Sequence, residues 1–126
     1  MPGLNGNTKI LLVNGEVTLQ HLRALMLRMK GYDVESAATL DEAKQKLTSG
    51  CFKLVIVDVG YYAEPGLRFC EEVKQTHPKV KVVMQANRQL FLNADSCPDK
   101  VISKQEGPQN FLSEVEMLLQ TSQEPA

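Results

Sequence analysis

Short apolar runs without polar alternation dominate the hydropathy pattern of the chain. Two of them, KILLV at Lys9–Val13 and KLVIVDVG at Lys53–Gly60, are rich in aliphatic residues, many of them β-branched. Such runs favour strands that are buried on both faces of a parallel sheet. Three shorter segments predict further strands, at Tyr32–Ala37, Val80–Met84 and Val101–Ser103.

Between the predicted strands, apolar residues recur three or four positions apart, which is the spacing of one face of an α-helix. The first such segment, Val17–Lys30, has its predicted apolar face at Leu22, Leu25, Met26 and Met29. Thr39 and Glu42 then form a capping box that opens a second helix. The remaining predicted helices are Gly66–Thr76, a short or irregular one within Asn87–Asp99, and one that begins at Gly107–Pro108.

Strands and helices therefore alternate five times along the chain. This order predicts an α/β fold, in which about five helices cover the two faces of a five-stranded parallel sheet. Right-handed crossovers and a length of 126 residues favour the flavodoxin-like strand order 2-1-3-4-5. We expect a single domain over residues 9–120, with flexible tails at residues 1–8 and 121–126.

The composition, 43% apolar and 23% charged, is that of a soluble globular domain. With a net charge of −1 and no run of membrane-spanning length, neither nucleic acid nor a membrane is expected as a partner. The first residues contain no apolar signal core, so we expect a cytoplasmic protein. Its three cysteines, Cys51, Cys70 and Cys97, form no C-x-x-C pair. They are therefore predicted to be reduced thiols rather than a disulfide framework or a zinc site.

Polar residues follow three of the predicted strands at the point where each strand ends. They are Asn14, Gly15 and Glu16 after the first strand, Asp58 in the third and Lys104 after the fifth. Because ligands bind at the carboxyl edge of open parallel sheets, Asp58 is the first candidate for a functional residue. Aspartate also caps turns that contain glycine, and the strand alone does not separate the two interpretations.

From Lys9 to Gln120 the sequence resembles the receiver domain of two-component response regulators. KILLVNGE is similar to the family's first strand and acidic turn, LVIVDV to its phosphoacceptor strand, and ADSCPDKVISK to the stretch that ends in its lysine. The resemblance implies that Asp58 is the phosphoacceptor, that Lys104 is this lysine, and that Gln85 stands where the family has serine or threonine. Glutamine is longer and cannot make the compact inward movement of those hydroxyls. A histidine kinase or another signalling protein is the implied partner.

The acidic pair that holds Mg²⁺ in this family is absent from the chain. Asn14 and Gly15 occupy its place, so a residual Mg²⁺ site would draw on Glu16, Asp58 and Gly60. Such a site is expected to bind the ion weakly or not at all, and no other cofactor is expected. Replacing Asn14 and Gly15 together by aspartate is expected to restore Mg²⁺ binding and modification of Asp58.

The sequence is thus identified as an atypical or degenerate receiver, a pseudo-receiver that acts as a protein–protein interaction module and not as an enzyme. Asp58 and Lys104 would remain as a vestigial ion pair, or would support slow phosphorylation with weakly bound metal. One alternative is a phosphorelay switch that accepts phosphate on Asp58 from a histidine kinase. Another is a flavodoxin-like small-molecule binder, which is disfavoured because VNGEVT lacks a glycine-rich phosphate loop.

Two apolar features predict contact surfaces. Tyr61 and Tyr62 follow the Asp58 strand, where they would form a partner contact if exposed or cover the loop if half-buried. The last helix carries a wide apolar stripe, beside which we expect a weak homodimer or a partner surface. The stripe consists of Phe111, Leu112, Val115, Leu118 and Leu119.

Overall fold

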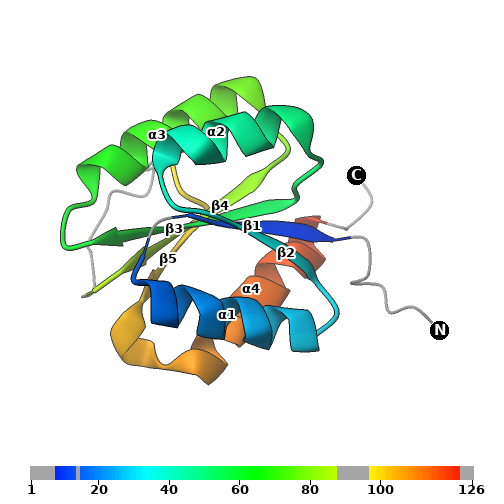
Figure 1. Ribbon diagram of the computed structural model, residues 1–126, viewed down its shortest axis with the longest axis vertical. Coiled ribbons are helices and arrows are strands. Elements are labelled where there is room, and N and C mark those ends of the chain that lie inside the picture. The colour runs from blue at the N-terminus through cyan, green and yellow to red at the C-terminus, as the bar shows by residue number, and fades with distance from the viewer. Residues whose placement is uncertain (1–7, 14, 88–96, 123–126) are drawn as a thin grey trace.

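The computed structural model describes residues 8–13, 15–87 and 97–122. Its five parallel strands form one sheet in the order β2-β1-β3-β4-β5 (Figure 1), which confirms the predicted topology. The strand bounds lie within two residues of those predicted: β1 (Lys9–Val13), β2 (Asp33–Ala37), β3 (Leu54–Gly60), β4 (Lys81–Ala86) and β5 (Lys100–Ser103).

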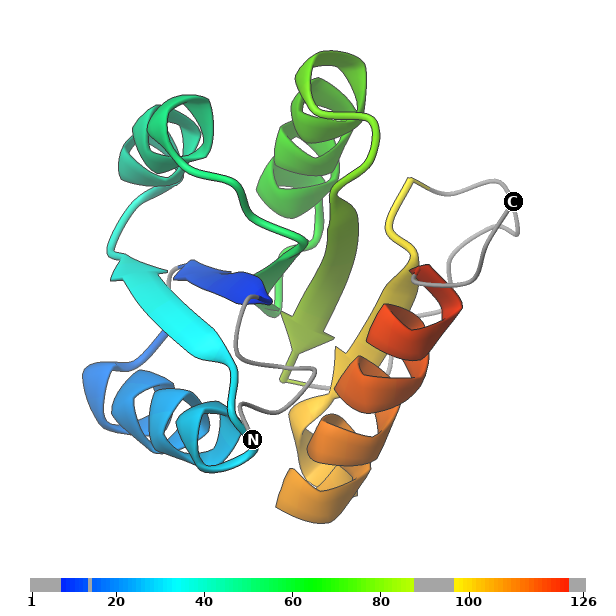
Figure 2. The ribbon, with the colours of Figure 1, turned by 90° about the vertical axis from the view of Figure 1, so that its right-hand side faces the viewer.

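Four α-helices and one short 3₁₀ helix lie in the described part of the chain: α1 (Val17–Met29), α2 (Leu40–Ser49), α3 (Glu64–Thr76), η1 (Lys104–Glu106) and α4 (Pro108–Ser122). The helices α2 and α3 cover one face of the sheet and α1 and α4 the other, so that the sheet is the middle of three layers (Figures 1 and 2). The predicted helix within Asn87–Asp99 lies for the most part outside the described residues. None of the described helices combines the length and the hydropathy that crossing a membrane requires.

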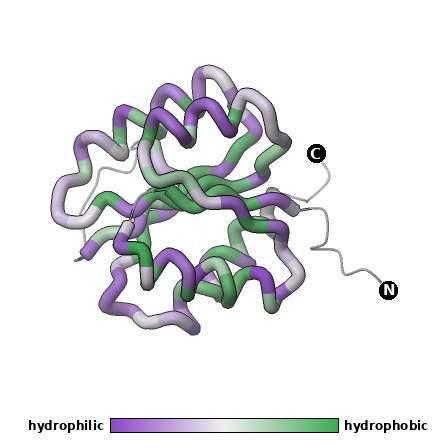
Figure 3. The backbone as a smooth tube through the Cα atoms, viewed as in Figure 1, coloured by the Kyte–Doolittle hydropathy of each residue, from purple (hydrophilic) through white to green (hydrophobic). Residues whose placement is uncertain are grey.

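Each face of the sheet has its own apolar core, and alternate side chains of the central strands supply both. Leu11 of β1 joins the core under α2 and α3, whereas Leu12 joins the core under α1 and α4. The residues of Ile10–Val13 and Leu54–Val57 are at most 2% exposed, as the unbroken apolar runs predict, and Figure 3 shows hydrophobic residues gathered in this layer. Because all five strands are parallel, their carboxyl ends meet at one edge of the sheet.

The buried face of α1 is not the one that the spacing of its leucines and methionines predicts. The exposed fractions are 49% at Leu22, 55% at Leu25 and 78% at Met29. Of the predicted face, only Met26 packs partly against the core, and Ala24 and Leu27 are buried against the sheet instead. Apolar residues occur on more than one side of this helix. The helical period alone therefore cannot say which side faces the sheet.

The orientation of α1 is tested by a matched pair of substitutions. Leu27→Ala should lower the free energy of unfolding by about 2–5 kcal/mol, because it opens a cavity between α1 and the sheet. Leu25→Ala should stay within about 0.5 kcal/mol of the wild type, because that side chain already contacts water. Urea denaturation followed by circular dichroism measures both values. Equal losses for the two variants would mean that the Leu25 face is buried after all.

A disulfide joins Cys70 of α3 to Cys97, and this corrects the prediction that all three cysteines are reduced thiols. The two residues are 27 positions apart, and their spacing gives no sign that they meet. The fold brings them together because α3 packs on the face of β3 and β4, and the chain at Cys97 leads into β5, the neighbour of β4. Cys51 is exposed and free, as predicted.

Breaking the disulfide should destabilise the domain. A reducing agent should lower the free energy of unfolding of the wild type by roughly 2–4 kcal/mol, because the cross-link restricts the unfolded chain. Cys70→Ala/Cys97→Ala, which has no cross-link to lose, should not respond to the reductant, whereas Cys51→Ala should respond like the wild type. Thermal melts with and without reductant measure this. An unresponsive wild type would mean that the two cysteines are thiols.

Candidate functional site

Asp58 lies at the carboxyl end of β3, and only 7% of its side chain is exposed. Its Oδ1 accepts a hydrogen bond of 3.0 Å from the N–H of Gly60, and its Oδ2 lies 2.6 Å from Nζ of Lys104. Lys104 begins η1 directly after β5, so two parallel strands deliver the two side chains to the same edge. The predicted proximity of Asp58 and Lys104 is therefore confirmed.

Arg23 of α1 is a second cation at Asp58, and no sequence pattern predicted it. Its Nη1 lies 3.6 Å from Oδ2 of Asp58, and 12% of its side chain is exposed. The guanidinium also lies 6.0 Å from the ring centre of Phe111 on α4, a distance at which a cation and an aromatic ring attract. Burial lowers the pKa of Arg23 and the Asp58 charge opposes that shift, and the side chain stays protonated. The sign of its role in the sequence is its position four residues before the buried Leu27, which places the two side chains on the same side of α1.

Gly15 approaches Asp58 from the end of β1. Its φ of 95° lies in the left-handed region, and a Cβ at this position would be 3.0 Å from Oδ2 of Asp58. An aspartate here would be both strained and crowded against the acceptor carboxylate. The structure therefore opposes the restoration of the acidic pair that the sequence suggests at this position. Asn14, the other member of that pair, lies outside the described residues.

Glu16 directs its carboxylate to its own helix. The two oxygens accept hydrogen bonds from the backbone N–H groups of Leu19, at 3.2 Å, and Thr18, at 3.3 Å. These bonds cap the amino end of α1, and they lower the pKa of Glu16. Glu16, the first carboxylate after β1 in the sequence, thus has a structural partner of its own.

Gln85 occupies β4 directly across from Asp58, where the register of the two strands pairs them. The residue is 3% exposed, and its Oε1 has no hydrogen-bond partner within the described residues. The glutamine is therefore packed into the sheet edge beside the carboxylate. The longer amide side chain fills space beside Asp58 in which the short hydroxyl of a serine or threonine could rotate.

The described residues do not offer the set of donors that Mg²⁺ requires. This ion takes oxygen ligands in near-octahedral geometry, carboxylates among them. Of the predicted ligands, Asp58 has both oxygens in contact with protein groups and Glu16 caps its helix. The carbonyl of Gly60 accepts the N–H of Asn87 at 2.9 Å. In the ranges that the structure describes, no group of three His, Cys, Asp or Glu side chains is placed to hold a metal ion.

A cavity of about 130 Å³ lies beside this site, between α1 and the start of α4. Arg23, Gln85 and Lys104 lie along it, so the polar groups around Asp58 border a hollow between α1 and α4. Its other walls are mainly apolar and are formed by Leu19, Leu22, Met26, Ser103, Gly107, Pro108 and Phe111.

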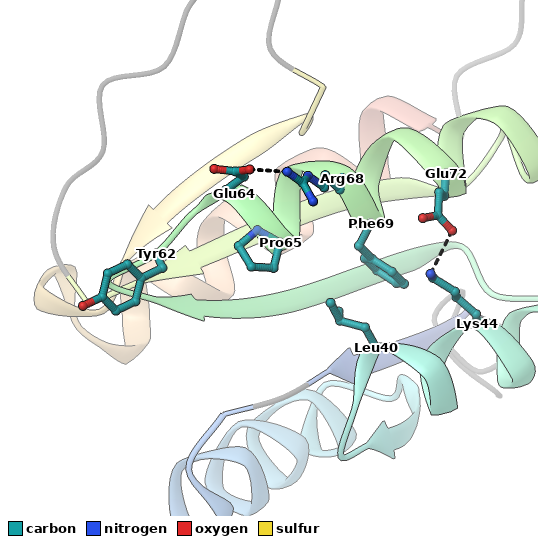
Figure 4. A pocket seen from close by; sticks show the side chains of 8 residues that line it. All are labelled: Leu40, Lys44, Tyr62, Glu64, Pro65, Arg68, Phe69 and Glu72. Carbon is teal, nitrogen blue, oxygen red and sulfur yellow. Dashed lines mark hydrogen bonds and ion pairs between the residues drawn. The ribbon is translucent and has the colours of Figure 1, made fainter.

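A larger hollow, of about 480 Å³, lies between α2 and α3 on the opposite face of the sheet (Figure 4). Leu40 and Phe69 line it, and two ion pairs flank it, Lys44–Glu72 at 2.9 Å and Glu64–Arg68. Tyr62 lies at one end and is 80% exposed, and Tyr61 is 59% exposed. The two tyrosines therefore do not cover the loop as half-buried residues, and their role as a partner contact stays a prediction.

The sequence profile of the response regulator receiver domain matches residues 10–116. This match covers most of the chain. The sheet order and the contact between Asp58 and Lys104 agree with it. The chain therefore belongs to the response regulator receiver domain family.

Two transcriptional regulators are similar in sequence. The CpxR homolog of Haemophilus influenzae is 28% identical over an alignment of length 131, and the match covers 88% of this chain and 57% of that protein. BasR of Escherichia coli is 29% identical over 104 residues, which cover 82% of this chain and 44% of BasR. The chain thus spans about half the length of these relatives.

The response regulator TrrA of Thermotoga maritima is similar in structure. In complex with Mg²⁺ and BeF it superposes with a TM-score of 0.77 at 24% identity, covering 88% of this chain and 98% of TrrA. In complex with the histidine kinase ThkA, the TM-score is 0.76 at 25% identity, covering 89% and 98%. The receiver fold is therefore present in this chain over most of its length.

Removal of the Asp58 charge should destabilise the domain. Asp58→Asn should lower the free energy of unfolding by about 2–4 kcal/mol, because Arg23 and Lys104 lose their buried counter-ion. As a control, Glu114→Gln breaks an ion pair with Lys100, whose side chain is 48% exposed, and should cost at most about 1 kcal/mol. Urea denaturation measures both variants. A more stable Asp58→Asn would instead indicate that unbalanced negative charge surrounds Asp58.

Proposed function

We propose that this receiver domain serves in two-component signal transduction as a protein–protein interaction module whose phosphorylation at Asp58 is impaired. One observation carries the proposal: protein groups already engage both carboxylate oxygens, the N–H of Gly60 at Oδ1 and the ammonium of Lys104 at Oδ2. Such contacts draw on the lone pairs with which a carboxylate oxygen would attack a phosphoryl donor, and so lower its nucleophilicity. The domain would then signal through its surfaces and not through catalysis.

The loss of charge neutralisation supports the same proposal. Phosphoryl transfer needs positive charge to offset the phosphoryl oxygens, and in such reactions a metal ion supplies much of it. Asn14 and Gly15 contribute no carboxylate to hold the ion, and Glu16 uses its own carboxylate to cap α1. We therefore propose that Mg²⁺ binds weakly or not at all and that Asp58 and Lys104 persist as a structural ion pair.

The exposed apolar side of α1 is the proposed docking surface. It consists of Leu22, Leu25 and Met29, and the cavity between α1 and α4 opens beside it. Contiguous exposed apolar residues of this kind mark sites of protein interaction. Because TrrA is known in complex with a histidine kinase, we propose a histidine kinase or another signalling protein as the partner. A net charge of −1 favours a protein over nucleic acid or an anionic membrane.

A cytoplasmic location and a weak homodimer complete the proposal. Disulfides are uncommon in the cytoplasm, so the Cys70–Cys97 bond would be an exception there. For the dimer, Met117 of α4 is 60% exposed and would lie at its centre. Most of the predicted stripe on α4 is already covered within the monomer, since Phe111, Val115 and Leu119 are at most 3% exposed.

A phosphorylatable switch is the second candidate function. The Asp58–Lys104 contact of 2.6 Å favours it, because a lysine in this position could contact a phosphoryl group carried by the aspartate. In that case a histidine kinase would donate phosphate to Asp58. The metal-binding carboxylates are the part of such a switch that the sequence lacks.

The two functions are separated by incubation with acetyl phosphate and Mg²⁺, followed by intact mass spectrometry. We expect the wild type to gain no phosphoryl group, because nothing offsets the charge of the transferring group. Asp58→Asn is the matched negative control, and a receiver domain with an intact acidic pair is the positive control. Stoichiometric modification of the wild type that Asp58→Asn abolishes would overturn the proposal in favour of the switch.

A further inference from the structure

We propose that the guanidinium of Arg23 is the resident counter-ion of Asp58 and takes the place that this family gives to a divalent metal ion. The inference deepens the proposed function and rests on it, because a site that supplies its own second cation neither needs nor accommodates Mg²⁺. Arg23 is in this sense a positioning residue, which sets the charge and the accessibility of the Asp58 carboxylate.

The contacts leave little of the carboxylate open to a metal ion. Nη1 of Arg23 lies 3.6 Å from Oδ2, the same oxygen that Nζ of Lys104 contacts at 2.6 Å. The N–H of Gly60 holds Oδ1, and the backbone of Gly15 closes in on Oδ2, where even a Cβ would come to 3.0 Å. A metal ion bound to Oδ2 would therefore have to displace one of the two cations.

The charges of the described side chains at the site point the same way. Arg23 and Lys104 contribute two positive charges. Asp58 contributes one negative charge and Glu16, which interacts electrostatically with Lys104, a second one, so the sum is zero. Two further carboxylates after β1 would make this sum negative and would attract a divalent cation. Asn14 and Gly15 supply neither. The absence of the acidic pair and the presence of a largely buried arginine are thus complementary, since each makes the other tolerable.

The burial of Arg23 explains why it needs Asp58. A guanidinium that is only 12% exposed is stable in a protein when it is paired with a counter-charge. The contact with Asp58 is its only ion pair within the described residues, and the ring of Phe111 is its other neighbour of note, at 6.0 Å. The pair therefore ties the middle of α1 to the end of β3 and to α4.

Metal affinity separates the two possible roles of Arg23. If Arg23 only stabilised the fold, its replacement would leave the affinity of the site for a metal ion unchanged. Mn²⁺ is titrated into ¹⁵N-labelled protein, and paramagnetic broadening of the amide signals of Gly15, Asp58 and Gly60 reports binding at the site. Arg23→Met removes the charge and keeps an apolar side chain of similar length. It should lower the Mn²⁺ concentration for half-broadening at least about tenfold, because a nearby positive charge is gone.

Two control variants isolate the position and the charge. Arg28→Met removes the same residue type from the same helix, where its guanidinium donates to the carbonyl of Val34 at 2.9 Å, and should leave the Mn²⁺ titration unchanged. Arg23→Lys keeps the charge and should also stay close to the wild type. If Arg23→Met binds Mn²⁺ no more tightly than Arg28→Met, Arg23 does not exclude the metal and the proposal is wrong.

Thermal melts of the double-mutant cycle test the pairing itself. Asp58→Asn should lower the Tm of the wild type by about 8 °C or more, and that of Arg23→Met by less than half as much. Additive losses would show that Arg23 and Asp58 do not interact. Phosphorylation of the wild type by acetyl phosphate would overturn the proposed function, whereas these two measurements decide the role of Arg23 independently of that result.

Discussion

The carboxylate of Asp58 is largely buried at the end of β3, where it contacts two cations from other parts of the chain. A buried charge costs several kcal/mol unless it is paired, so α1, which carries Arg23, and η1, which carries Lys104, must dock where these contacts form. The interaction therefore sets the geometry of the functional edge of the sheet. It also determines what that edge can do, because a carboxylate held in this way is a poor nucleophile.

The chain keeps the receiver scaffold while changing the groups that surround its central aspartate. Gly15 brings backbone close to the carboxylate where an acidic side chain would be strained. Glu16 caps α1, and Gln85 packs beside Asp58 with a buried amide. We propose that each change removes one means of binding or sensing a phosphoryl group. The exposed apolar side of α1, in contrast, offers a surface on which a protein partner could dock. Because the site has changed and this surface is present, we favour an interaction module.

The sequence predicted the sheet and the Asp58–Lys104 contact because both follow from local patterns: apolar runs define buried strands, and parallel topology gathers their ends. Only half of the predicted capping box formed. Thr39 accepts the N–H of Glu42 at 3.1 Å, but the Glu42 carboxylate accepts the N–H of Ala38, at 2.9 Å, instead of that of Thr39. The disulfide could not be predicted, because it depends on which elements become neighbours in the fold. Arg23 was missed for the same reason as the orientation of α1. Once Leu27 is known to face the sheet, an arginine four residues earlier must find a buried partner.

The most direct test of the account is a crystal structure of the wild type grown at high Mg²⁺ concentration with beryllofluoride, the two ligands that TrrA binds in its complex. We predict that the guanidinium of Arg23 and the ammonium of Lys104 remain beside Asp58, with neither a metal ion nor beryllofluoride on the carboxylate. An octahedral metal ion bound to Asp58, with Arg23 displaced from the site, would contradict the account.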